Sequence, residues 1–175
     1  PSFQELSTIA VINIQTFTSG TATYVPFLDT LYCQIECIGG GGAGGGATVS
    51  SVGSGGCSAG GGGGGGGYAS IILPVASVSG QTITVGIGAS GTAAAGMAGE
   101  TSSVGSLISA SGGDGGGMIL DNELSMVLGG AGGTGAFGDL NFSGQPGGRA
   151  WIFDEISESQ AIAIGGMGGG SILLG

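Results

Sequence analysis

The sequence has almost no positive charge. Its 175 residues carry 11 acidic groups, no lysine, no histidine and one basic residue, Arg149, for a formal net charge of −10. Proteins that bind nucleic acids use lysine and arginine to displace the counterions of the phosphates, and proteins that bind anionic membranes use the same residues. The composition therefore excludes nucleic acids and anionic membrane surfaces as partners.

Long apolar runs and cysteine pairs are also missing. The apolar stretch from Ala69 to Val78 is far shorter than the roughly 20 residues of a membrane span, so no membrane insertion is expected. Cys33 and Cys37 lie in a strand-like run in which their Cα atoms would be about 13 Å apart, beyond disulfide reach. Without histidine or a CxxC pair, zinc has no ligand set. We therefore expect no metal and no cofactor. Free thiols indicate that the protein is assembled in a reducing cytoplasm.

Two short motifs suggest enzymes, but the residues around them do not support one. Residues 56–60 match the GxSxG pattern of serine hydrolases, which need a base, normally histidine. Residues 86–91 match GxGxxG, but the glycine-broken stretch that follows is a poor helix, and a dinucleotide site requires one. Paired acids at 121/123 and 154/155 lack the alternating ligands of a calcium loop. The sequence predicts no catalytic residue and no enzyme.

Glycine dominates what is present. There are 46 glycines, including the run 39–46, broken only by Ala43, and eight consecutive glycines at 60–67. Such runs form either a flexible tether or polyproline-II rods, which have three residues per turn and no internal hydrogen bonds. Only glycine lets rods approach closely enough to bond to each other. Because 7% of the residues are charged and 41% are hydrophobic, the composition is unlike that of disordered chains and favours packed rods.

The segments between the glycine runs alternate like strands. The clearest strand is expected over 31–37, and others over 8–18, 68–75, 81–87 and 102–110. No segment has a sustained helical period. The expected fold class is all-β with glycine-rich polyproline-II-like rods and very little helix. We expect a small antiparallel β-unit at 1–38, followed by a packed polyglycine scaffold with loop inserts at 39–175.

The order of these segments resembles a known family. The similarity runs through Tyr24-Val25-Pro26, the strand at 31–37 that leads into the first glycine run, Gly67-Tyr68-Ala69, the stretch 81–86, Thr101 to Gly105, and Gly138 to Phe142. Together these resemble the glycine-rich C-terminal tip of the tail fibres of tailed bacteriophages and prophages, or of bacterial adhesins derived from them. The resemblance covers about residues 10–148. It implies a fibre tip that is a homotrimer and binds a receptor on a bacterial surface, either an outer-membrane protein or a glycan.

Two inserts depart from the family pattern and are the candidate receptor-binding loops. The first spans 118–128, and the second, 149–164, holds the single tryptophan and the single arginine. Exposed aromatic side chains contribute recognition energy at a low entropic cost, and acids complement basic receptor loops. The candidate residues are Met118, Ile119, Leu120, Asp121, Asn122, Glu123, Trp151, Phe153, Asp154 and Glu155.

Two alternatives remain open at this point. The apolar residues of the inserts could instead pack between rods or across a subunit interface, because apolar inserts are usually buried. A protein of another class, a structural glycine-rich or ice-binding polyproline-II bundle, would share the composition. The expected location is the distal end of a virion tail fibre or of a cell-surface fibre.

Overall fold

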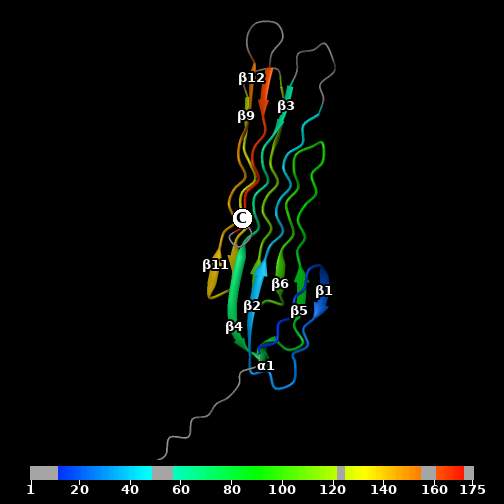
Figure 1. Ribbon diagram of the computed structural model, residues 1–175, viewed down its shortest axis with the longest axis vertical. Coiled ribbons are helices and arrows are strands. Elements are labelled where there is room, and N and C mark those ends of the chain that lie inside the picture. Colours follow the sequence, from blue (N-terminus) through cyan, green and yellow to red (C-terminus); the bar gives the residue numbers. More distant parts are fainter. Residues whose placement is uncertain (1–11, 49–56, 122–124, 155–160, 172–175) are drawn as a thin grey trace, which may run out of the picture.

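The computed structural model describes residues 12–48, 57–121, 125–154 and 161–171. The molecule is elongated, with short strands at its two ends and glycine-rich segments running side by side between them (Figure 1). We call the end that carries β9 and β12 the upper end and the end that carries α1 the lower end, as Figure 1 is drawn.

The described chain is almost entirely β, which confirms the predicted fold class. One short helix is present, α1 at Val75–Val78. The strands are β1 Gly20–Thr23, β2 Tyr32–Ile38, β3 Cys57–Gly60, β4 Tyr68–Pro74, β5 Thr82–Val85, β6 Ser102–Val104, β7 Ile108–Ala110, β8 Met118–Asp121, β9 Ser125–Val127, β10 Gly135–Ala136, β11 Leu140–Phe142, β12 Ala150–Asp154 and β13 Ala161–Ile164. The strands expected over 31–37, 68–75, 81–87 and 102–110 are therefore found as β2, β4, β5, and the β6–β7 pair. Residues 12–18 of the strand expected at 8–18 form no strand, and the rest of that stretch lies outside the described residues.

Antiparallel sheets form both ends. The lower end holds a sheet of order β1-β5-β6-β7-β10 and another of order β11-β4-β2. The upper end holds a sheet of order β13-β12-β9 and the pair β3-β8. β1 pairs with β5 and β2 pairs with β4, so the first strands bond to strands that follow the first glycine runs.

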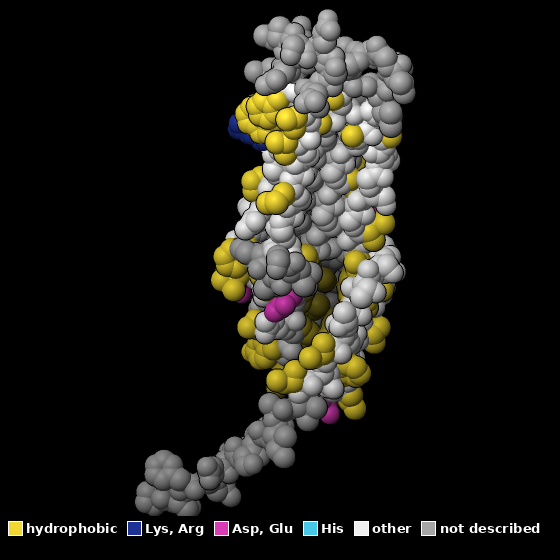
Figure 2. All heavy atoms as spheres, turned by 45° about the horizontal axis from the view of Figure 1, so that its top comes forward, with side chains coloured by type: hydrophobic (Ala, Val, Ile, Leu, Met, Phe, Trp, Pro, Cys, Tyr) yellow, Lys and Arg dark blue, Asp and Glu magenta, His cyan; other side chains and the backbone are white. Residues whose placement is uncertain are grey.

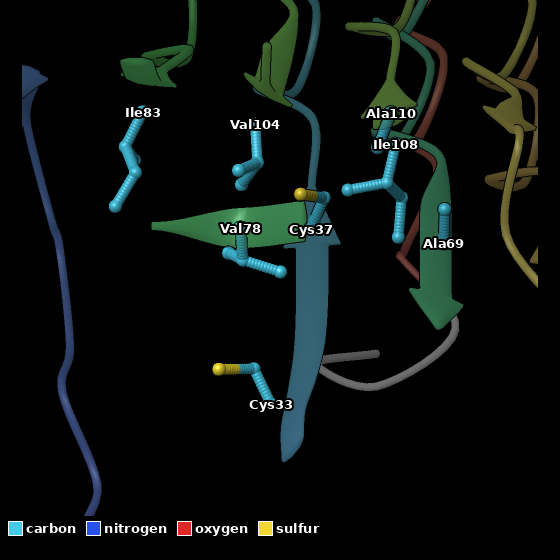
Figure 3. Close-up of a cluster of buried hydrophobic side chains, with 8 residues drawn as sticks. All are labelled: Cys33, Cys37, Ala69, Val78, Ile83, Val104, Ile108 and Ala110. Carbon is cyan, nitrogen blue, oxygen red and sulfur yellow. The ribbon is translucent and has the colours of Figure 1, made fainter. Parts of the chain in front are cut away.

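The main hydrophobic core lies at the lower end (Figure 3). Its buried members are Cys33, Cys37, Ala69, Val78, Ile83, Val104, Ile108 and Ala110. Neither Cys33 nor Cys37 forms a disulfide, as expected. Burial raises the pKa of the Cys37 thiol to about 11. The Tyr24 hydroxyl lies 3.4 Å from the Cys33 sulfur, and this hydrogen bond raises the pKa of Tyr24 to about 12.

Between the two ends, the glycine segments form parallel and antiparallel rods. We number them in chain order: rod 1, 39–46; rod 2, 60–67; rod 3, 86–91; rod 4, 96–101; rod 5, 111–117; rod 6, 128–134; rod 7, 143–149; rod 8, 165–171. Rod 1 shows their conformation. The N–H groups of Gly39, Gly42 and Gly45 all donate to rod 2, whereas those of Gly40 and Ala43 donate to rod 4. A partner that recurs every third residue is the signature of the three-fold polyproline-II helix, so the rods expected from the sequence are present.

Rod 2 is the centre of the bundle. Its N–H groups donate to rods 5 and 7, and its carbonyls accept hydrogen bonds from rods 1, 6 and 8. These N···O distances are 2.8–3.0 Å. A Cβ atom on Gly66 would overlap the backbone carbonyl of Gly39, and one on Gly64 would overlap that of Ala131. The unbroken glycine run is therefore required because the rods approach until their backbones touch.

Candidate functional site

The upper end presents a three-stranded sheet whose centre is β12. In its antiparallel pairing with β13, Trp151 lies opposite Ile164 and Phe153 opposite Ile162. In its pairing with β9, Trp151 lies opposite Met126. Residues directly opposite each other in antiparallel strands share one face of the sheet. Met126, Trp151, Phe153, Ile162 and Ile164 therefore form one surface, which we call the apolar face.

The apolar face is open to solvent. Trp151 is 39% exposed and Phe153 is 43% exposed, and the other three side chains are more than 40% exposed as well. The rings of Trp151 and Phe153 stack with their centroids 6.2 Å apart and their planes 15° apart. Figure 2 shows a cluster of hydrophobic side chains near the upper end, bordered by the basic side chain. Such clusters of exposed aromatic and aliphatic side chains are uncommon on soluble monomers and often mark binding surfaces.

The opposite face of the same sheet is buried and fixes it to the bundle. Ile152 and Ala150 are completely buried and pack with Ala59 of β3. Cys57, Ile119 and Val127 pack against this cluster. Because side chains alternate along a strand, burying Ile152 forces its neighbours Trp151 and Phe153 outward. The second core thus sets the orientation of the apolar face.

Arg149 precedes β12 at the edge of the apolar face. Its guanidinium Nη1 donates to the Sδ of Met126 at 3.5 Å. The side chain is exposed, and no acidic partner contacts it among the described residues. The single cation of the chain therefore lies beside its largest upper-end aromatic cluster.

The structure places the predicted site residues in three settings. Trp151 and Phe153 lie on the apolar face, whereas Met118 is half-buried in β8 and Ile119 packs against the second core. For Leu120, Asp121 and Asp154 only the strand backbone is described. Asn122, Glu123 and Glu155 lie outside the described residues.

Three residues of the apolar face were missed from the sequence. Met126, Ile162 and Ile164 join Trp151 and Phe153 only because β9 and β13 pair with β12. The signal that could have found two of them is the alternation of isoleucine with alanine in 161–164, which is typical of a strand with its larger side chains on one face.

Metal-ligating side chains do not gather anywhere among the described residues. No group of three or more His, Cys, Asp or Glu side chains in the described ranges could hold a metal ion. The described part of the chain also contains no helix with the length and hydropathy of a membrane span. What the upper end offers is a surface for non-covalent contact.

The comparisons with known proteins identify the family. None of the curated proteins and none of the solved structures matches the chain. The sequence model of a family described as glycine-rich domain matches residues 16–173. The glycine runs, the rods that they form and the strands at both ends all fall within this match. The chain therefore belongs to the glycine-rich domain family.

Proposed function

We propose that this chain is a non-catalytic adhesin, the receptor-binding tip of a phage tail fibre or of a bacterial fibre derived from one. The observation that carries the proposal is the apolar face, with two stacked aromatic rings held outward by the buried Ile152. Aromatic residues on a rigid support are the usual centres of binding energy in protein interfaces. The sequence resemblance to fibre tips supplies the biological setting.

The position of the apolar face at one end of an elongated molecule fits this role. The larger set of sheets, with β1, β2 and β4, lies at the lower end, and the apolar face lies at the opposite end of the rods (Figure 1). In our proposal the lower end faces the fibre and the upper end faces the bacterial surface. The receptor is a surface protein or glycan with an apolar or sugar-ring patch, because aromatic rings stack on both. Acidic side chains of the chain would complement basic receptor groups at the rim.

A ring-truncation experiment tests the site. The labelled chain is titrated onto a panel of bacterial strains and binding is measured by flow cytometry. On a strain that binds, the double variant Trp151→Ser, Phe153→Ser should lose at least about 30-fold in affinity, because hot-spot side chains contribute about 2 kcal/mol or more. Circular dichroism and the melting temperature should stay close to those of the parent, since both rings are exposed.

The matched control lies at the other end. Leu31 and Tyr32 are exposed apolar residues of the lower end, at 74% and 67%. The variant Leu31→Ser, Tyr32→Ser removes similar apolar area and should bind cells normally. Loss of binding in this control with full binding of the ring variant would refute the proposed site. Absence of binding to every strain would refute the adhesin proposal itself.

We also propose that the tip assembles as a homotrimer, as the fibre-tip resemblance implies. Three copies on one fibre would convert weak individual contacts into strong attachment. Mass photometry of the purified chain across a concentration series measures this directly. A chain that stays monomeric at all concentrations would contradict the trimer while leaving the apolar face as a site.

A further inference from the structure

One side of the central rod has no neighbour among the described residues. A three-fold rod has three N–H and three C=O groups per turn, which point in six directions around its axis. The N–H groups of Gly61, Gly64 and Gly67 donate to rod 5, and those of Gly62 and Gly65 donate to rod 7. Gly60 belongs to β3, which pairs with β8. The N–H groups of Gly63 and Gly66 donate to no acceptor among the described residues.

The hydrogen bonds show where these two groups point. Around rod 2, the neighbours are linked in the order rod 1 to rod 5, rod 5 to rod 6, rod 6 to rod 7 and rod 7 to rod 8. No hydrogen bond within the described chain links rod 8 to rod 1. Among the described residues the ring of neighbours is therefore open between rods 8 and 1, and the N–H groups of Gly63 and Gly66 face this opening.

The rows of rods locate a second open position. Rods 6, 5 and 4 form one row, and rods 7, 2, 1 and 3 form the next, with Ala89 of rod 3 donating to Gly41 of rod 1. Rod 8 stands alone in a third row, against rods 7 and 2. Two positions beside it hold no described residue: one is bordered by rods 8, 2 and 1, and the other by rods 1 and 3. The N–H groups of Gly41 and Gly44 also have no acceptor among the described residues and serve the second position. We call these two positions the groove.

The glycines that border the groove support this geometry independently. Almost every rod glycine whose surroundings are described is so crowded that a Cβ atom would overlap neighbouring backbone or, at Gly117, the side chain of Val127. Six are not, and they come in pairs three residues apart on the rods that border the groove: Gly41 and Gly44, Gly88 and Gly91, Gly165 and Gly168. The nearest atom to a Cβ on Gly44 is 3.5 Å away, and a Cβ on Gly168 would have no neighbour within 4 Å. Nothing described requires glycine at these six positions.

Further rods in the groove would require it. Every rod that packs on another brings its carbonyl oxygens to the place where a Cβ would stand, as at Gly66 and Gly64. Glycine is otherwise disfavoured, because it loses the most backbone entropy on ordering. Ser171 follows Gly165 and Gly168 in the same three-residue register, and its hydroxyl oxygen is buried without a hydrogen-bond partner. Both features fit a surface that is finished by more backbone.

We propose that the groove is filled by two further glycine-rich polyproline-II rods, antiparallel to each other and covalently continuous with rod 8. An occupant must accept hydrogen bonds from Gly63 and Gly66, whose N–H groups are one turn apart, roughly 9 Å in a polyproline-II rod. It must also donate to carbonyls of rods 1 and 8, which a proline-rich segment cannot do because proline has no N–H. Glycine-rich backbone satisfies both conditions.

The path of the chain favours a continuous segment. Rod 3 hydrogen-bonds to rod 1, and from rod 4 to rod 8 each rod hydrogen-bonds to the rod before it, so the chain winds around rods 1 and 2. The next two places on this path are the two positions of the groove. A segment joined to rod 8 reaches them by the same short connections that link the other rods.

The test extends the chain after residue 175 with two copies of the 60–67 run joined by the 92–95 connection. Amide hydrogen exchange is followed by NMR, with Gly64 as the internal standard, because its N–H is already bonded to Asp114 at 2.9 Å. The extension should slow exchange at Gly63, Gly66, Gly41 and Gly44 at least tenfold and leave Gly64 unchanged. An extension of equal length with serine in place of glycine is the control and should give no protection.

Two further experiments, a substitution in rod 8 and the addition of a free peptide, distinguish the possible outcomes. Gly168→Val has room in the unextended chain and should leave its melting temperature unchanged, but it should abolish the protection given by the extension. The same glycine segment is also added as a free peptide. Protection by the peptide and not by the extension would overturn covalent continuity, and protection by neither, with Gly64 still protected, would overturn the proposal.

Discussion

Replacing one glycine of rod 2 should destabilise the whole molecule, whereas replacing one glycine at the groove should not. A methyl group on Gly64 overlaps the backbone carbonyl of Ala131 in rod 6. Rod 6 must then move away from rod 2. This stretches the bonds from Gly130 to the Gly62 carbonyl and from Gly133 to the Gly65 carbonyl, both 2.8 Å. Each such bond contributes about 1 kcal/mol net, and a buried group left unpaired costs a further 1–3 kcal/mol or so.

We therefore expect Gly64→Ala to lower the free energy of unfolding by about 2–4 kcal/mol. The matched variant Gly44→Ala introduces the same methyl group where the nearest atom is 3.5 Å away. Alanine at a compatible position stabilises by about 0.4–1 kcal/mol through the unfolded state, so this variant should be neutral or slightly stabilised. Urea denaturation followed by circular dichroism measures both. Equal losses for the two variants would refute the argument that backbone contact between rods, rather than glycine content alone, holds the bundle together.

Two further predictions concern the two cores. Ile152→Ala should lower the free energy of unfolding by about 2–4 kcal/mol, because Ile152 is fully buried. Ile164 is 51% exposed, so Ile164→Ala should change the free energy of unfolding by less than about 0.5 kcal/mol in the same denaturation assay. Since burial raises the pKa of Cys37 from 9.0 to about 11, the folded chain keeps a proton that the unfolded chain releases. The contribution of this thiol to stability should therefore be constant below pH 9 and fall between pH 9 and 11, and the raised pKa of Tyr24 should add to the fall above pH 10. Denaturation midpoints across this range measure the effect, and Cys37→Ala should make the fall shallower. A midpoint that rises with pH would contradict the assignment.

Much of the fold could be predicted because its determinants are local. The alternation in 31–37 gives β2 directly, since its buried residues Cys33 and Cys37 fall on one face. The run at 60–67 predicts rods because glycine leaves no other packed option. What local patterns do not contain is which strands pair: β1 bonds to β5 and β2 to β4, in both cases across the two glycine runs at 39–46 and 60–67.

The candidate site was predictable only in part for the same reason. Trp151 and Phe153 stand out by composition, whereas Met126 and Ile162 reach the same face through strand pairing alone. Ile119 looked equivalent to them in the sequence, but it packs against the second core, because β8 pairs with β3 and not with β12.

The hydrogen-bond pattern of the rods also has a mechanical consequence. When a fibre is pulled lengthwise, rods bonded sideways slide past one another, so all the bonds along a rod are loaded together in shear. Rod 2 shares that load with five neighbours. If the chain is the fibre tip that we propose, tension between the fibre and an anchored cell would therefore spread over the whole cross-section before any one bond breaks.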